Sequence, residues 1–201
     1  YSEDNGMYSE HLIIFAAIAN SKFRPKKILE IGTYDGKTAL ILSVLFPEST
    51  ITTIDLKDDD LIFKNTYHRN KKYSDFSEKR NVILKKNSKI NFLQSNSLEL
   101  ALMNEIESQD LIWVDGAHGY PIVTSDITNA IRLLQNDGIL MCDDIWKYLK
   151  RNDKIYNSIA SFETLNAFEK AGIIKTTYFR KRINVKYSSK YKFVSFSRLN
   201  K

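Results

Sequence analysis

Three aspartates and one histidine follow two apolar runs in the second half of the sequence. Asp115 ends the run 110–115, His118 lies three residues later, and Asp143 and Asp144 follow the run 138–142. If both runs are parallel strands, their carboxyl ends lie at one edge of a sheet and the three carboxylates converge there. Carboxylates that lie close together repel one another, and a divalent cation with oxygen ligands, such as Mg²⁺, would neutralise them. We therefore predict a magnesium site of Asp115, Asp143 and Asp144. The alternative is that one aspartate caps a helix and another faces solvent.

His118 is the candidate general base. A histidine is substantially neutral near physiological pH and can accept a proton from a substrate hydroxyl. In the turn-like sequence Asp-Gly-Ala-His-Gly-Tyr it can also be a structural hydrogen-bonding group only. The other two histidines, His11 and His68, have no comparable surroundings, and we assign them no role.

A glycine-containing segment, 30–36, follows the first apolar run. A strand that turns directly into a helix beneath a ligand needs residues without a Cβ, and Gly32 and Gly36 are suitably placed. A dinucleotide-binding motif starting at Gly32 would need glycine at positions 34 and 37, which are Tyr34 and Lys37. A phosphate-binding loop needs four residues between its glycines, and this chain has three. The spacing therefore excludes both of these nucleotide motifs.

The remaining pattern favours a nucleoside attached to an amino acid. Asp55 ends the second apolar run, where its carboxylate could accept hydrogen bonds from the two hydroxyls of a ribose. Glu30 and the start of the following helix suit a ligand with an ammonium and a carboxylate group, as at the methionine end of S-adenosylmethionine (SAM). Tyr34 and Thr38 could pack on that end and hydrogen-bond to it. We therefore predict a SAM site.

The elements that must position these residues follow from the hydrophobic pattern. Apolar runs of four to six residues alternate with helical patterns, which indicates βαβ units and a parallel sheet. The expected strands are 27–31, 51–55, 90–94, 110–115, 138–142, 174–179 and 191–196, and the expected helices are 9–21, 37–46, 122–134 and 156–170, with a helix and a long loop within 57–89. This predicts a Rossmann-like fold of the α/β class, and the family resemblance given below implies that it is the SAM-methyltransferase fold. Its seven-stranded, mostly parallel sheet would have helices on both faces and a C-terminal antiparallel hairpin.

Length and composition fit one soluble domain. The 201 residues form a single expected domain, with an N-terminal helical segment (1–25), a cofactor-binding core (26–146) and a C-terminal helix and hairpin (147–201). The single cysteine excludes an intrachain disulfide and suits the cytoplasm, and no apolar run is long enough to span a membrane. Residues 175–201 contain nine Lys or Arg and no acid, which we interpret mainly as a solvated edge strand.

Two stretches resemble known enzyme families. The run E-I-G-T-Y-D-G-K-T is similar to the first motif of metal-dependent O-methyltransferases of the catechol and caffeoyl-CoA type. The D-x-x-H pattern with a later acidic pair looks more like macrocin-type sugar O-methyltransferases and cephalosporin-hydroxylase-like proteins. The resemblance implies that Asn96 and Ser97 contact the adenine. Together with the residues above, the expected cofactor-binding set is Glu30, Gly32, Thr33, Tyr34, Gly36, Thr38, Asp55, Asn96, Ser97 and Asp115.

The expected function is SAM-dependent, Mg²⁺-dependent methyl transfer to a hydroxyl of a small molecule. A sugar or other polyol is the first choice of acceptor, and a catechol-like phenol is the second. Two alternatives stay open: a metal-dependent, hydroxylase-like protein that does not methylate, and a nucleic-acid methyltransferase or binding module. Only the basic C-terminal segment suggests the latter, so a nucleic-acid partner is not expected. Self-association into a homo-oligomer stays open.

Overall fold

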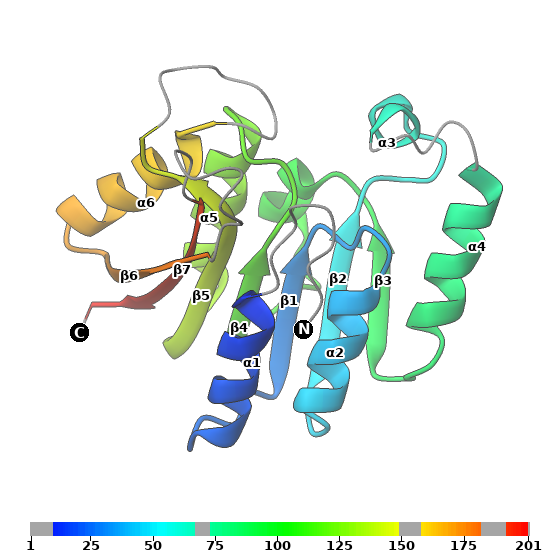
Figure 1. The fold of residues 1–201 in the computed structure, drawn as a ribbon, viewed down its shortest axis with the longest axis horizontal. Helices are drawn as coiled ribbons and strands as arrows, with labels where there is room; N and C mark the ends of the chain where they lie inside the picture. The colour runs from blue at the N-terminus through cyan, green and yellow to red at the C-terminus, as the bar shows by residue number, and fades with distance from the viewer. Residues whose placement is uncertain (1–9, 67–72, 149–157, 182–191, 201) are drawn as a thin grey trace.

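One seven-stranded sheet organises the molecule (Figure 1). The computed structural model describes residues 10–66, 73–148, 158–181 and 192–200. The strand order is β3-β2-β1-β4-β5-β7-β6, in which β1 to β5 are parallel and β7 is antiparallel to both of its neighbours. The strands are β1 (Lys27–Ile31), β2 (Thr50–Asp55), β3 (Ile90–Gln94), β4 (Gln109–Val114), β5 (Leu134–Trp146), β6 (Ile174–Arg180) and β7 (Lys192–Leu199).

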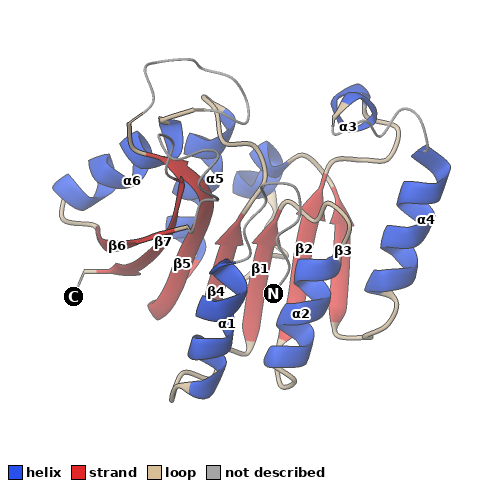
Figure 2. Ribbon diagram, viewed as in Figure 1, coloured by secondary structure: helices blue, strands red, loops and turns tan. Residues whose placement is uncertain are grey.

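Helices cover both faces of this sheet (Figure 2). α1 (Glu10–Asn20), α2 (Lys37–Leu45) and α4 (Tyr73–Leu84) belong to one face, where α2 contacts both of the other helices. On the other face, α5 (Ile122–Leu133) packs against α6 (Ala160–Lys170) and the 3₁₀-helix η2 (Ser97–Leu102). The short helix α3 (Leu61–Asn65) lies above the carboxyl end of the sheet (Figure 1).

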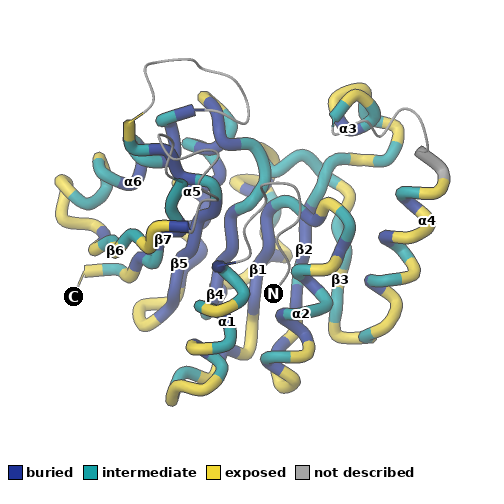
Figure 3. Tube along the Cα trace, viewed as in Figure 1, coloured by how far each residue is buried: buried dark blue, intermediate teal, exposed yellow. Residues whose placement is uncertain are grey.

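The alternating direction of the strand side chains explains why the hydrophobic core has two layers, one on each face of the sheet. Successive strand side chains point to opposite faces of a sheet. In β4, Leu111 and Trp113 belong to the hydrophobic cluster under α1 and α2, whereas Ile112 and Val114 belong to the cluster under α5 and α6. The central strands are therefore buried on both sides, and the exposed residues gather on the outer turns of the helices (Figure 3). Runs of consecutive apolar residues are the expected signature of such strands.

The predicted fold class is confirmed, and the differences lie at element boundaries. The hairpin of β6 and β7 is present, and the segment 57–89 contains two helices, α3 and α4, rather than one. β5 begins at Leu134, directly after α5 ends at Leu133, and not at Gly138 as expected. The expected elements that begin at Ser9, Tyr156 and Tyr191 start outside the described residues.

β5 is irregular where two of the predicted site residues lie. Its pairing with β7 shifts register between Cys142 and Ile145, and Asp144 has a positive φ of 51°. In a regular strand, Asp143 and Asp144 would point to opposite faces. A bulge redirects side chains in the strand that carries it. The irregularity thus allows two consecutive carboxylates to contact the same partner, as described below.

Candidate functional site

The first predicted motif forms a tight turn at the carboxyl end of β1. Gly32 has φ 103°, and its N–H donates to the carbonyl of Ile54 at 2.9 Å. A Cβ on Gly32 would lie 2.6 Å from the carbonyl carbon of Asp115 and 2.8 Å from the Cα of Gly116. Both the backbone angle and the close approach of the β4 end therefore require glycine here.

Asp55 is fixed at the end of β2 by backbone donors. The N–H of Tyr34 donates to Asp55 Oδ2 and the N–H of Leu56 donates to Oδ1, each at 2.8 Å. Tyr34 has a φ of 48°, an uncommon value for a non-glycine residue that aims its N–H at the carboxylate. A carboxylate oxygen can accept more than one hydrogen bond. The arrangement therefore fits the predicted ribose contact.

Glu30 is a fully buried carboxyl group beside this turn. Its Oε2 accepts a hydrogen bond from Thr53 Oγ1, which in turn lies 2.6 Å from Thr33 Oγ1. Among the described residues, Glu30 Oε1 has no hydrogen-bond partner. Burial raises the pKa of Glu30 to about 8, against the opposing effect of the Thr53 hydrogen bond. An unsatisfied buried oxygen at this position fits the ammonium group of a methionine moiety.

Other predicted cofactor residues lie around the same edge of the sheet but already use polar atoms within the chain. The Thr33 hydroxyl is bound to Thr53, so it supports Glu30 instead of pointing at a ligand. Asn96 caps η2, because its side-chain oxygen accepts from the N–H of Leu98 at 3.1 Å. Gly36 precedes α2 with a φ of 77°, and Thr38 is half-buried in the first turn of that helix. The adenine and methionine contacts of these residues stay predictions.

Ser97, the other predicted adenine contact, lies close to a buried acid of α5. Asp126 has no solvent exposure, and burial raises the pKa of its carboxyl group to about 7, while the nearby Ser97 hydroxyl opposes that shift. Asp126 also lies behind the turn after β4, since a Cβ on Gly116 would be 3.8 Å from Asp126 Oδ2. The sequence did not single out Asp126, because its spacing in α5 is that of an ordinary core position.

His118 and Asp115 meet at the end of β4, as predicted. His118 Nε2 lies 3.9 Å from Asp115 Oδ1, and the imidazole is 4% exposed. Burial is the largest influence on His118 and lowers its pKa, although Asp144 and Asp143 act in the opposite direction. His118 is therefore neutral at physiological pH and can act as a base.

The predicted magnesium set stays a prediction, and the structure gives two of its carboxylates ammonium partners within the chain. Among the described residues, no three His, Cys, Asp or Glu side chains are grouped as a metal ion requires. Asp143 and Asp144 instead bind a lysine, because Lys181 Nζ lies 2.5 Å from Asp143 Oδ1 and 2.8 Å from Asp144 Oδ1. Lys192 Nζ pairs with the other oxygen of Asp144. The carboxylates do converge near Asp115, but ammonium groups and not open coordination positions face two of them.

Charge coupling within this cluster is strong. Burial alone would favour the neutral form of Asp144, but the ammonium groups of Lys181 and Lys192 outweigh it and hold the pKa of that carboxyl below its usual value. Burial likewise opposes the charge of Lys181, yet Asp143 and Asp144 raise the pKa of its ammonium above the ordinary value. The ion-paired state is thus the stable one for these groups.

Sequence reasoning missed three residues of the cluster: His11, Lys181 and Lys192. His11 Nδ1 lies 3.8 Å from Asp143 Oδ2, and its ring is 5.2 Å from that of Trp113. Burial lowers the pKa of His11. No sequence signal could have found these residues, because they reach the site from α1 and from the hairpin, far away along the chain. The basic segment was expected to be solvated, but Lys181 is 3% exposed.

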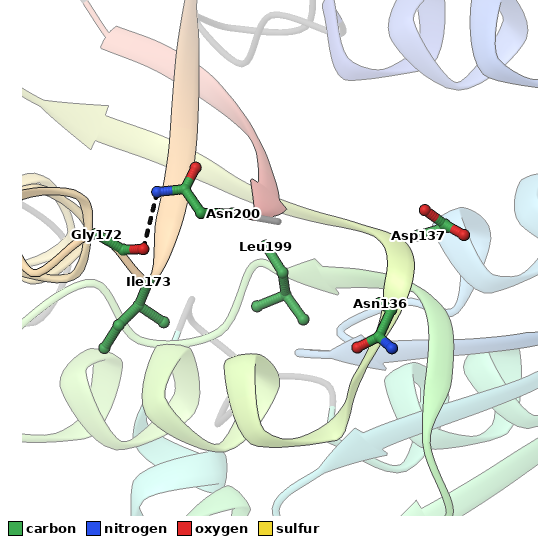
Figure 4. Close-up of a pocket in the computed structure, with 6 residues that line it drawn as sticks. All are labelled: Asn136, Asp137, Gly172, Ile173, Leu199 and Asn200. Atoms are coloured by element: carbon green, nitrogen blue, oxygen red, sulfur yellow. Dashed lines mark hydrogen bonds between the residues drawn. The ribbon is translucent and has the colours of Figure 1, made fainter.

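A separate hollow lies away from this site. It measures about 620 Å³ and is lined by residues at the start of β5, in the α6–β6 turn and at the end of β7 (Figure 4). The hydrogen bond from Asn200 Nδ2 to the carbonyl of Gly172 crosses its wall at 2.8 Å. Its residues Asn136 and Asp137 lie near the start of β5, so the hollow lies at the amino end of the parallel strands. It is therefore not the predicted cofactor site.

Comparison with known proteins decides the family. A family model described as a methyltransferase domain matches residues 29–145, more than half of the chain. The chain belongs to the methyltransferase domain family. This match contains the turn at Gly32, Asp55, Asp115 and His118, together with both aspartates of β5. No curated protein matches the sequence.

Solved structures share the fold of this methyltransferase. The O-methyltransferase TomG from Streptomyces achromogenes, in complex with SAM, is 14% identical, with a TM-score of 0.66 over 99% of this chain and 83% of the other. An O-methyltransferase from Bacillus cereus with S-adenosylhomocysteine (SAH) is 13% identical, with a TM-score of 0.63 over 99% and 84% of the two chains. The N-methyltransferase NodS from Bradyrhizobium japonicum is 15% identical, with a TM-score of 0.63 over 96% of each chain. The predicted methyltransferase family and the predicted fold are therefore confirmed. In the part of the chain that is described, no helix is long and apolar enough to cross a membrane.

Proposed function

We propose that this methyltransferase transfers the methyl group of SAM to a hydroxyl oxygen of a small molecule. The observation that carries the proposal is the convergence, at the carboxyl ends of β1, β2 and β4, of the Gly32 turn, the clamped Asp55 and the neutral His118. The turn and Asp55 fit the two ends of the cofactor. His118 supplies the one feature that a hydroxyl acceptor requires and that the fold by itself does not provide.

Each residue has a defined part in this proposal. SAM, when bound, supplies a methyl group on a positively charged sulfur. Asp55 orients the ribose, and Glu30 faces the ammonium end. His118 accepts the proton of the acceptor hydroxyl as the new carbon–oxygen bond forms and the sulfur–carbon bond breaks, which leaves SAH and a methyl ether. Holding the acceptor oxygen in line with the methyl group makes the step effectively unimolecular. A sugar or other polyol stays the first choice of acceptor, and a phenol the second.

A His118→Ala variant tests the catalytic part of the proposal. We expect methyl transfer from radiolabelled SAM to a panel of sugars, polyols and phenols to fall by at least a hundredfold. SAH binding, measured by calorimetry, should be unchanged, because His118 is not in the Gly32–Asp55 turn. Unchanged turnover would remove His118 from the mechanism.

An Asp55→Ala variant provides the complementary control. It should weaken SAH binding at least tenfold, since the ribose loses its acceptor, while the His118 pair is left intact. If the wild-type protein binds no SAH, the alternative of a related protein that has lost methylation is favoured. Oligonucleotide binding that weakens steeply with salt would instead favour a nucleic-acid acceptor.

A further inference from the structure

The cation in the acidic cluster of this methyltransferase is part of the chain itself. Lys181 is the residue that follows β6, and its N–H donates to the carbonyl of Lys192 at 2.9 Å, which closes the hairpin next to β5. This geometry brings both ammonium groups to the same aspartate. Asp144 Oδ1 pairs with Lys181 and Oδ2 with Lys192, and Asp143 Oδ1 shares Lys181.

The local backbone is shaped for this pairing. Asp143 and Asp144 converge on one ammonium group because the bulge in β5 and the positive φ of Asp144 break the alternation of the strand. The side chain of Lys181 is 4% exposed and that of Asp143 is 7% exposed, so water screens their attraction only weakly. A buried charge is stable only with a partner, which makes the lysine and the aspartates mutually dependent.

A divalent cation fits this arrangement poorly. Mg²⁺ binds carboxylate oxygens at roughly 2.0–2.1 Å and requires nearly octahedral geometry. Three of the four oxygens of Asp143 and Asp144 already face ammonium groups, and two positive lysines would repel an incoming cation. The two lysines also carry the same total charge as one divalent ion. The charge that a metal would supply to this cluster is therefore already present.

We infer that Lys181, together with Lys192, takes the place of a divalent cation in this site, so that methyl transfer by this chain needs no metal. The inference rests on the proposed function for its catalytic part, whereas the occupation of the site by lysine stands independently. Lys181 is a positioning residue, because it acts through its ion pairs with Asp143 and Asp144.

Measuring Mn²⁺ binding tests whether lysine occupies the acidic site, and it requires no methyl transfer. The free Mn²⁺ signal in electron paramagnetic resonance should stay unchanged when wild-type protein and SAH are added, which indicates no stoichiometric site. In Lys181→Ala, the exposed carboxylates should bind Mn²⁺ at least tenfold more tightly than in wild type. Lys175→Ala is the matched control, because Lys175 is an exposed lysine on β6 and its loss should leave Mn²⁺ binding unchanged.

Two further variants distinguish the occupation of the acidic site by lysine from a general loss of the folded structure. Lys181→Arg keeps the positive charge and should not bind Mn²⁺. If Lys181→Ala does not fold, Lys181→Met keeps the volume of the side chain and should acquire the Mn²⁺ site instead. Stoichiometric Mn²⁺ binding by the wild type that Asp143→Asn abolishes would overturn the inference, as would a folded Lys181→Met without any gain in Mn²⁺ affinity.

Chelation tests the catalytic part. With any acceptor that the wild type methylates, the rate should be unchanged after dialysis against EDTA. Only Lys181→Ala and Lys181→Met should respond to added Mn²⁺. Loss of wild-type activity in EDTA that added metal restores would refute metal independence. A protein that methylates no acceptor contradicts the proposed function and leaves the Mn²⁺ result to decide the occupation of the site.

Discussion

Replacing Gly32 with alanine should damage the cofactor turn far more than an ordinary glycine substitution. The variant places a Cβ 2.6 Å from the Asp115 carbonyl carbon and 2.8 Å from the Gly116 Cα, both backbone atoms that cannot rotate away. It also forces alanine into a φ of 103°. An unfavourable φ costs about 1–3 kcal/mol, and overpacking of a tight contact costs about 1–3 kcal/mol more. We therefore expect Gly32→Ala to lower the free energy of unfolding by about 2–6 kcal/mol.

Gly172→Ala is the matched control for this prediction. Gly172 also has a positive φ, 72°, but a Cβ there would meet no atom within 4 Å. Gly172→Ala should therefore lower the free energy of unfolding only by the cost of alanine in a left-handed backbone conformation, about 1–2 kcal/mol. The difference between the two variants isolates the close approach of β1 and β4 at the cofactor turn.

Urea unfolding of the wild type and both variants measures these costs, and calorimetry with SAH measures the effect on the site. Gly32→Ala should bind SAH at least tenfold more weakly, because separating the two strand ends moves the turn away from Asp55. Gly172→Ala should bind SAH like the wild type, since it lies at the opposite end of the sheet. Equal unfolding midpoints for the two variants, or unchanged SAH affinity in Gly32→Ala, would refute this account of the turn.

Two titratable groups lead to further predictions. Burial raises the pKa of Glu30 from 4.5 to about 8, so the unfolded chain gives up this proton at lower pH than the folded one, and the group destabilises the fold increasingly as pH rises from 4.5 to 8. In thermal unfolding, Glu30→Gln should therefore be more stable than the wild type at pH 8, by up to about 4 kcal/mol, with no gain near pH 4. The variant should also bind SAH more weakly. An equal gain in stability at both pH values would contradict the raised pKa of Glu30. Burial lowers the pKa of His118 below 6.5, so kcat/KM should rise with pH along a limb centred below 6.5 and stay constant from pH 7 to 8. Because Lys192 also disfavours protonation of His118, Lys192→Met should move the rise of kcat/KM to higher pH. In the wild type, a rise of kcat/KM centred above pH 7 would exclude His118 as the base.

The sequence by itself determined the sheet and the cofactor end of the site. Strands buried on both faces are continuous apolar runs, which can be recognised locally. The spacing of Gly32 and Gly36 and the position of Asp55 at a strand end are also local properties. Because parallel strands end at the same edge, local recognition was enough to place Asp55 and Asp115 at the carboxyl edge of the sheet.

Only the tertiary structure decided what the acidic cluster contains. Asp143 and Asp144 looked like metal ligands because the sequence shows their charges without their partners. Lys181 lies 37 positions after Asp144, directly after β6. Lys192 lies 48 positions after Asp144 and begins β7, the strand that folds back beside β5. The register shift between Cys142 and Ile145, which accompanies the convergence of both carboxylates on one ammonium group, was not recognised from the sequence. Electrostatic partners are chosen by distance in space, and across an antiparallel hairpin that distance cannot be inferred from residue types or spacing.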